Sequence, residues 1–309
     1  MIVTVTMNPA LDKTAEIARL EPRRLNRLSG VRVDAGGKGV NVSKMIKVLG
    51  GESVCTGFVG GGAGQELCER IERMGIRHRF LTVAGVTRTN LKIMDADSGL
   101  TELNEPGVAV TGAEMDALLE QTKDLAGPDG IVVLSGSLPQ NAEAGTYRVF
   151  AEALKEAGCT VLADADGDSF KKAIEAPPDV IKPNRFELLQ YYGLPQDTPD
   201  GELPSLCRKF LERGVAWVIL SLGENGAMFF TKDRCVRAGT LPVEVRSTVG
   251  AGDSMVGAAA YALEKRMSFE ETAKLAMAAS IGAVTTEGTN APSRELVGEL
   301  MSRIALEEI

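Results

Sequence analysis

The sequence predicts an α/β fold with a mainly parallel sheet and a second, smaller β-sheet. From Thr111 onward, short apolar runs typical of buried strands alternate with segments whose apolar residues recur at helical spacing. This alternation indicates parallel strands joined by helices that cover both faces of the sheet. Residues 14–35 and 86–107 hold short alternating segments instead, and we expect them to form a small sheet separate from the core. The core then comprises residues 1–13, 36–85 and 108–309.

Each element is expected from its local pattern. Strands are expected where β-branched and apolar residues alternate or run together between turn residues: 1–6, 28–33, 54–59, 87–94, 100–103, 130–134, 160–163, 180–181, 216–220, 227–230, 235–238 and 241–246. Helices are expected after the glycine turn at 36–39 and at 65–74, 111–125, 142–157, 185–192, 203–213, 252–264, 269–286 and 293–304. Residues 8–12 are expected to form a loop, and residues 95–99 a hairpin turn.

Composition limits the function. The chain has 309 residues and a formal net charge of -8, so a broad surface for nucleic acid or for an anionic membrane is not expected. The N-terminus lacks the basic lead and apolar run of a signal peptide, and no apolar run is long enough to span a membrane. Five scattered cysteines without a Cys-x-x-Cys pair indicate a reducing cytoplasm and argue against zinc, and a single histidine excludes chemistry that needs several imidazoles.

Residues 247–257, Ser-Thr-Val-Gly-Ala-Gly-Asp-Ser-Met-Val-Gly, lead from an expected strand into an expected helix. Gly250 and Gly252 allow a tight turn and the close approach of a ligand to backbone amides. Because the first amides of a helix are unpaired and lie at its positive end, this stretch predicts an anion site. Asp253 is either a helix-capping carboxylate or the group that turns this anion site into a reaction centre.

Residues 36–43, Gly-Gly-Lys-Gly-Val-Asn-Val-Ser, form a second glycine turn before a helix. The spacing does not match a Walker P-loop, since Gly39 stands where Ser or Thr is required. Lys38 offers a charge and Asn41 a bidentate amide to a polar ligand. The alternative is a plain flexible turn.

Several other strand ends carry polar groups, and the carboxyl ends of parallel strands share one ligand-binding edge. Asp12 follows the first strand and is either a ligand-binding group or part of an Asx-turn, which would explain it equally well. Arg88 is either a bidentate donor to a phosphate or a solvated strand residue. Residues 135–139, 182–187 and 221–226 are further strand-end turns. Asn184 and Glu187, on one face of a helix start, are suited to a hydrated Mg²⁺ or to a capping arrangement.

Together these stretches resemble the signature motifs of the pfkB-type carbohydrate kinases of the ribokinase superfamily. The stretches that carry the resemblance are Gly36 to Asn41, Lys182 to Glu187, Ser221 to Gly226 and Gly250 to Asp253, in the order of the family and over nearly the whole chain. Residues 8–12, 87–90, 135–139 and 247–249 are similar to the branch that acts on phosphorylated ketohexoses, and most closely to its fructose 1-phosphate kinases. The resemblance implies a three-layer sandwich whose small sheet is a lid, ATP and Mg²⁺ as cofactors, and a homodimer formed through the lid.

The resemblance also implies a role for each site residue. Asp253 would be the base, beside an anion hole formed by the amides of Gly250, Ala251 and Gly252. The sugar phosphate would be bound by Asp12, Gly37, Lys38, Asn41, Arg88, Asn90 and Ser137. ATP would be bound by Lys182, Asn184, Ser221, Gly223 and Gly226, and Glu187 would belong to the magnesium shell. We also expect the positive end of the helix to lower the pKa of Asp253.

The expected reaction is the ATP-dependent phosphorylation of a ketohexose monophosphate, with fructose 1-phosphate as the favoured substrate and fructose 1,6-bisphosphate as the product. The alternatives within the family are tagatose 6-phosphate and fructose 6-phosphate. Outside kinase chemistry, Ser254 in a near Gly-x-Ser-x-Gly stretch would suit a hydrolase, but the stretch ends in Val256 and His78 is the one imidazole available. A sensor of sugar phosphates without catalysis would have no need of Asp253.

Overall fold

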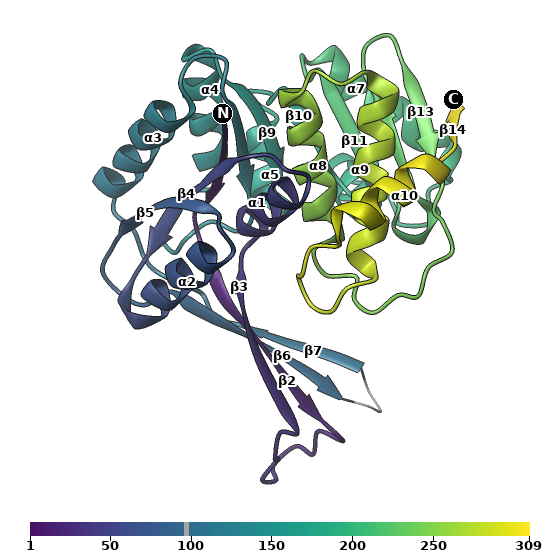
Figure 1. The fold of residues 1–309 in the computed structure, drawn as a ribbon. Coiled ribbons are helices and arrows are strands. Elements are labelled where there is room, and N and C mark those ends of the chain that lie inside the picture. The colour runs from purple at the N-terminus through teal and green to yellow at the C-terminus, as the bar shows by residue number, and fades with distance from the viewer. Residues whose placement is uncertain (96–98) are drawn as a thin grey trace.

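The computed structural model describes residues 1–95 and 99–309, and two sheets organise them (Figure 1). The large sheet has ten strands in the order β14-β13-β12-β11-β10-β9-β8-β1-β4-β5, and the small sheet has four in the order β3-β2-β6-β7. The pairs from β11 to β5 are parallel, whereas β12, β13 and β14 pair antiparallel at one edge. The predicted α/β fold with a mainly parallel sheet and a second small sheet is confirmed.

The elements have the following bounds. The strands are β1 Ile2–Thr6, β2 Ala10–Ile17, β3 Gly30–Gly36, β4 Ser53–Val59, β5 Arg77–Thr82, β6 Arg88–Asp95, β7 Gly99–Asn104, β8 Ile131–Ser135, β9 Thr160–Asp164, β10 Val180–Ile181, β11 Trp217–Ser221, β12 Ala227–Phe230, β13 Cys235–Ala238 and β14 Leu306–Glu308. The helices are α1 Lys38–Val48, α2 Gly61–Arg73, α3 Gly112–Ala126, α4 Thr146–Glu156, α5 Gly167–Ala173, α6 Arg185–Tyr192, α7 Leu203–Glu212, α8 Ala251–Glu264, α9 Phe269–Val284 and α10 Arg294–Arg303, with 3₁₀ turns at Asp200–Glu202 and Gly223–Asn225.

The large sheet buries both of its faces under helices. Along β8, Val132 and Leu134 pack with α3 to α7 on one face, whereas Ile131 and Val133 pack with α1, α8, α9 and α10 on the other. Because side chains alternate along a strand, a strand covered on both sides is apolar throughout. No helix in the described part of the chain is long and apolar enough to cross a membrane.

The small sheet projects from the core as two hairpins set side by side (Figure 1). Strand β2 pairs antiparallel with β3 and parallel with β6, and β6 pairs antiparallel with β7. Its described strands span residues 10–17, 30–36, 88–95 and 99–104. The turn predicted at 95–99 includes residues 96–98, which lie outside the described residues.

Two local predictions are wrong. Residues 241–246 form no strand; the backbone amide of Arg246 donates to Val284 C=O at 2.8 Å, at the end of α9, instead of joining the sheet. Residues 8–12 are not all loop, because β2 already begins at Ala10, where the chain leaves the core for the small sheet. Elements β5, α5 and β14 were not predicted, because they are short or lack a clear period.

Candidate active site

Helix α8 begins at the glycine turn of residues 247–257. Its N-cap, Gly250, has a left-handed backbone (φ 83°), which a residue with a β-carbon adopts only with strain. Ser254 N–H donates to Gly250 C=O at 2.9 Å, so the helical bonding begins there. The amides of Gly250, Ala251 and Gly252 precede that bond and lie at the positive end of the helix. The helix start is therefore suited to an anion.

Asp253 lies in the first turn of α8, is 8% exposed and is hydrogen-bonded by a residue of α1. Its Oδ2 accepts a hydrogen bond from Asn41 Nδ2 at 2.8 Å. Burial raises the pKa of Asp253, and the charge of Asp164 adds to the rise. The prediction that the helix start lowers this pKa is wrong, because desolvation and the second carboxylate outweigh the favourable groups. A raised pKa makes Asp253 a better proton acceptor.

Helix α1 begins at the second glycine turn. Its N-cap, Gly37, has φ 110°, and a β-carbon there would lie 2.7 Å from Thr6 Cγ2, so only glycine fits. Lys38 follows, and its ammonium lies 3.5 Å from Asp164 Oδ2. The other oxygen of Asp164, at the end of β9, lies 3.3 Å from Lys182 Nζ. Asp164 therefore joins a lysine of α1 to a lysine that follows β10.

The shared carboxylate sets the charge state of this cluster. Burial favours a higher pKa for Asp164, but the charges of Lys182 and Lys38 outweigh it and hold the pKa of Asp164 below its ordinary value. In turn Asp164 raises the pKa of Lys38 above its ordinary value, against the effect of burial. Lys38 is therefore a fixed positive charge close to Asp253, in a protein whose net charge is negative.

Side chains of the small sheet form two hydrogen-bonded clusters in the same region. Asp12 on β2 accepts hydrogen bonds from Asn90 Nδ2 and Lys92 Nζ, each at 3.0 Å. This contact follows from the register, which sets Asp12 opposite Asn90. Arg88, at the start of β6, donates from Nη2 to Ser137 Oγ at 3.1 Å, and burial lowers the pKa of Arg88. Arg88 and Ser137 thus offer donors from the small sheet and from the core.

A cavity of about 490 Å³ lies between the edge of the large sheet and the small sheet. The predicted site residues that line it are Asp12, Gly37, Lys38, Asn41, Arg88, Asn90, Ser137, Gly250 and Asp253. Ala251 and Gly252 continue into α8 beside it, and a β-carbon on Gly252 would lie 3.2 Å from Lys182 Nζ. The structure therefore brings the predicted sugar and catalytic residues together around one cavity.

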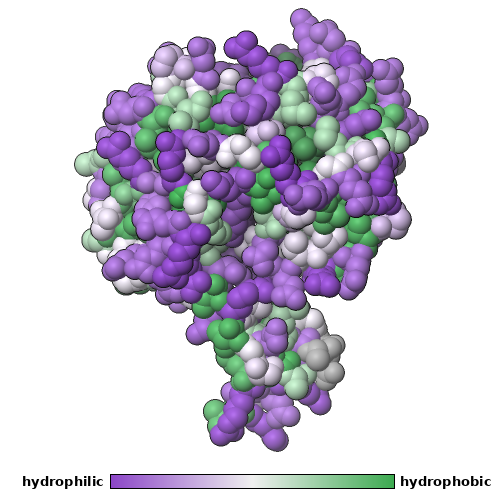
Figure 2. Space-filling model, in the orientation of Figure 1, coloured by the Kyte–Doolittle hydropathy of each residue, from purple (hydrophilic) through white to green (hydrophobic). Residues whose placement is uncertain are grey.

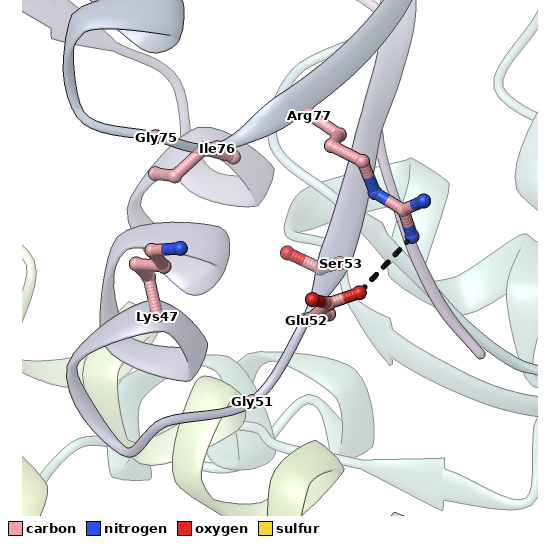
Figure 3. Close-up of a pocket in the computed structure, with 7 residues that line it drawn as sticks. All are labelled: Lys47, Gly51, Glu52, Ser53, Gly75, Ile76 and Arg77. Carbon is pink, nitrogen blue, oxygen red and sulfur yellow. Dashed lines mark ion pairs between the residues drawn. The ribbon is translucent and has the colours of Figure 1, made fainter.

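Another, much smaller cavity of about 40 Å³ lies between the end of α1 and strands β4 and β5 (Figure 3). Lys47, Gly75 and Ile76 line it, and on its other side Arg77 approaches Glu52 at 3.6 Å. None of the predicted site residues lines this cavity. The large cavity is therefore the candidate active site.

The residues predicted to bind nucleotide do not line the large cavity but follow the neighbouring strand ends. Asn184 and Ser221 form a parallel bridge there; Gly223 begins the short 3₁₀ turn after β11, and Gly226 follows it. Glu187 and Asn184 form a capping box at the start of α6: Asn184 N–H donates to Glu187 Oε2 at 2.8 Å, and Glu187 N–H to Asn184 Oδ1 at 2.8 Å. The capping arrangement, one of the two readings of this pair, is present.

Four residues of the site were missed in the sequence. Asp164 pairs with two lysines, and Lys92 pairs with Asp12. Lys44 donates to both Asn41 and Thr289. Asp164 follows an expected strand directly, which is the one signal that pointed to it. The lysines gave none, because a lysine in a helix or strand pattern is ordinarily a solvated residue.

The hydrolase alternative finds no support in this arrangement. Ser254 is 5% exposed and lies inside α8. His78, on strand β5, bonds through Nε2 to Glu72 at 3.0 Å rather than to a serine. A nucleophilic serine needs an imidazole within hydrogen-bond reach.

A family model described as pfkB family carbohydrate kinase matches residues 5–296. The chain belongs to this family. Its relatives include a 1-phosphofructokinase of Vibrio cholerae, 31% identical over 98% of this chain and 95% of that protein, and one of Bacillus subtilis, 33% identical over 98% of each. Among solved structures, the phosphofructokinase-2 of Escherichia coli in complex with fructose-6-phosphate aligns with a TM-score of 0.90 and 26% identity, covering 97% of this chain and 98% of that one.

The pfkB kinase described here is therefore an ATP-dependent sugar-phosphate kinase with a ribokinase-like fold. The cavity geometry agrees with this chemistry, since phosphoryl transfer depends on positioned positive groups and one group that accepts a proton.

Proposed function

We propose that this kinase transfers the γ-phosphoryl group of ATP to a ketohexose monophosphate, and that the substrate is fructose 1-phosphate. The observation that carries the proposal is the cavity that places Arg88, Ser137 and Lys38 on its wall with Asp253. Cationic donors suit a substrate phosphate, and a buried carboxylate suits the acceptor hydroxyl. The relatives from Vibrio cholerae and Bacillus subtilis are named 1-phosphofructokinase, which supports fructose 1-phosphate over the other ketohexose monophosphates.

Asp253 takes the proton of the acceptor hydroxyl as the new P–O bond forms. Its raised pKa suits that role, and the hydrogen bond from Asn41 fixes one of its oxygens, leaving the other for the substrate. The amides of Gly250, Ala251 and Gly252 hold the charge that develops on the transferred group. Most of the acceleration then comes from position and electrostatics.

The sugar phosphate binds across the gap between the small sheet and the core. Arg88 and Ser137 donate to its phosphate, and Lys38 adds charge. The Asp12 carboxylate accepts hydrogen bonds from the sugar hydroxyls, and the Asn90 amide can both donate and accept them. Gly37 and Asn41 complete the wall beside Asp253.

ATP lies along the neighbouring strand ends, bound by Lys182, Asn184, Ser221, Gly223 and Gly226, with its γ-phosphate at the start of α8. The position of Lys182 Nζ, 3.3 Å from Asp164 and close to Gly252, supports this assignment, because it puts a cation beside the helix start. The product nucleotide is ADP.

A magnesium ion fits next to Glu187 only through water. One carboxylate oxygen of Glu187 is already used by the Asn184 amide, and burial raises the pKa of Glu187. In the part of the chain that the structure describes, no three His, Cys, Asp or Glu side chains form a metal cluster. A hydrated Mg²⁺ held by phosphate oxygens suits such a site and would offset the phosphate charge.

The alternatives are fructose 6-phosphate and tagatose 6-phosphate. The first has a specific observation in its favour, because the Escherichia coli phosphofructokinase-2 that aligns over 97% of this chain was solved with fructose-6-phosphate. The same phosphate donors would serve either substrate.

A coupled ADP-release assay over free and phosphorylated sugars at equal concentration tests the proposal. We expect the highest kcat/KM for fructose 1-phosphate. Faster turnover of fructose 6-phosphate or tagatose 6-phosphate would reassign the substrate. Turnover of free sugars alone would refute the assignment of a site for the substrate phosphate.

A further inference from the structure

Lys44 lies in the middle of α1, one turn after Asn41, and is only 7% exposed. Its ammonium donates to Asn41 Oδ1 at 3.0 Å and to the backbone carbonyl of Ala35 at 2.6 Å. It also donates to Thr289, at 3.1 Å to Oγ1 and at 3.4 Å to the carbonyl. One cation therefore contacts three separate segments: the end of small-sheet strand β3, helix α1 and the loop that follows α9.

All of these acceptors are neutral oxygens. No carboxylate lies within ion-pair distance of Lys44 among residues 1–95 and 99–309, although Asp34, Asp12 and Asp253 are near enough to raise its pKa. Burial, helped by the like charge of Lys92, lowers the pKa of Lys44 to about 8. A buried cation without an ionic partner destabilises a fold unless its hydrogen bonds are complete. Such a group is costly to retain for packing alone.

The contact with Asn41 decides which way its side-chain amide faces. Because Lys44 occupies the amide oxygen, the amide nitrogen is turned to Asp253, where it donates at 2.8 Å. The reversed amide would set two oxygens against each other and would leave the ammonium without one acceptor. The chain of bonds from Lys44 through Asn41 to Asp253 is buried along its length.

We propose that Lys44 is a positioning residue for phosphoryl transfer: it fixes the Asn41 amide that orients Asp253, and it ties that amide to the end of β3 and to the loop at Thr289. This inference rests on the function proposed above. Ala35 precedes the glycine turn where the small sheet joins α1, and Thr289 lines the cavity. The ammonium therefore joins the catalytic carboxylate to both borders of the sugar site.

The test compares Lys44→Met, Lys44→Arg and Lys47→Met. The matched control Lys47 lies on the same helix and lines the small cavity of Figure 3 rather than the candidate active site. We expect Lys44→Met to lower kcat roughly tenfold or more, with the KM for ATP within about twofold of the original. Lys44→Arg should restore part of the loss, and Lys47→Met should change nothing. If Lys44→Met turns over as fast as Lys47→Met, the proposal is wrong.

The pH profile separates positioning from a packing role. The ammonium has three donors, and the neutral amine that forms near pH 8 has two, so kcat of the original chain should fall as pH rises through this range. Lys44→Arg stays charged, and its alkaline fall should disappear. An identical alkaline fall in Lys44→Arg would contradict the proposal, and this comparison stands even if Lys44→Met does not fold.

A third readout needs no substrate, so it separates this inference from the proposed function. The side-chain amide signal of Asn41 in a ¹⁵N spectrum, assigned by its loss in Asn41→Asp, should shift and exchange faster in Lys44→Met than in Lys47→Met. An unchanged signal would overturn the positioning role. If the signal changes but no sugar phosphate is turned over by the original chain, the proposed function fails and the positioning of Asn41 remains.

Discussion

At the scale of single residues, Asp253 combines properties that ordinarily oppose each other. It is buried beside a second carboxylate, which raises its pKa, and it lies at a helix start, where anions are favoured. The hydrogen bond from Asn41 and the charges of the nearby lysines partly stabilise its ionised form. Burial and the neighbouring carboxylate prevail, so the carboxylate of Asp253 accepts a proton more readily than an ordinary aspartate does.

Asp253→Asn tests this residue first. Without a proton acceptor, turnover should fall roughly 10²-fold or more, while the KM for the sugar phosphate stays nearly unchanged, because the phosphate donors are intact. Steady-state kinetics on fructose 1-phosphate checks this. Turnover within a factor of a few of the original would refute the base assignment.

The same substitution should change stability with pH in a defined direction. Because the folded-state pKa of Asp253 is raised, its proton is bound more tightly in the folded chain, so ionisation destabilises the fold as pH rises through that pKa. Asp253→Asn should therefore raise the melting temperature by a few degrees at neutral pH. The gain should shrink below the ordinary aspartate pKa, and a gain that instead grew toward acid would contradict the raised pKa.

Arg88→Ala tests the phosphate assignment. Removing a charge-assisted donor should raise the KM for the sugar phosphate roughly 10–100-fold and that for ATP much less. Arg73→Ala, an exposed arginine of α2 paired with Glu69, is the matched control. Equal rises for both substrates would place Arg88 elsewhere in the reaction.

At the scale of elements, the start of α8 depends on a backbone conformation at Gly250. A β-carbon there would meet nothing nearer than 3.8 Å, so Gly250→Ala introduces strain from φ alone. We expect a loss of roughly 1–2 kcal/mol in the free energy of unfolding and a clear fall in kcat/KM for ATP, since the anion-binding amides would turn. Denaturant titration and kinetics measure both.

Gly298→Ala is the control for that experiment. Gly298 lies inside α10 with open space around its β-carbon position, so alanine there should stabilise by roughly 0.5–1 kcal/mol and leave activity unchanged. If Gly250→Ala behaved like Gly298→Ala, the left-handed start of α8 would have no catalytic importance.

Some of these elements could be predicted from the sequence, and others could not. The glycine turns before α1 and α8 were predictable because glycine before a helical period is a local signal, and both turns reach one cavity. The extent of β2 was not, because its residues pair with β6, far along the chain. Residues 241–246 alternate like a strand but find their backbone partner in α9. The burial that raises the pKa of Asp253 likewise arises only after folding.

At the scale of the whole molecule, the face of the small sheet that points away from the cavity carries exposed apolar side chains. Val31 is 53% and Leu103 55% exposed, and Leu103 lies opposite Leu91. Figure 2 shows hydrophobic side chains on the part of the molecule that projects below the core. Exposed apolar surface of this kind suits a protein partner, and we expect a second copy of the chain to cover it.

Sedimentation velocity tests that expectation. The original chain should form dimers, and Leu103→Lys should shift the population toward monomers. Leu100→Lys is the control, because Leu100 is 45% exposed on the opposite face of the same strand. A monomer at every concentration, or equal effects of both substitutions, would remove the dimer through the lid.

Asp12, Arg88 and Asn90, which we propose to bind the sugar phosphate, lie on the small sheet, whereas Asp253 lies in the core. In the proposed complex, the small sheet binds the sugar and the core carries the base, so the alignment of the two depends on how the small sheet meets the core. A substrate that fills the gap incompletely would leave the pair misaligned. We therefore expect the hydrolysis of ATP by water to be slow when no sugar phosphate fills the cavity.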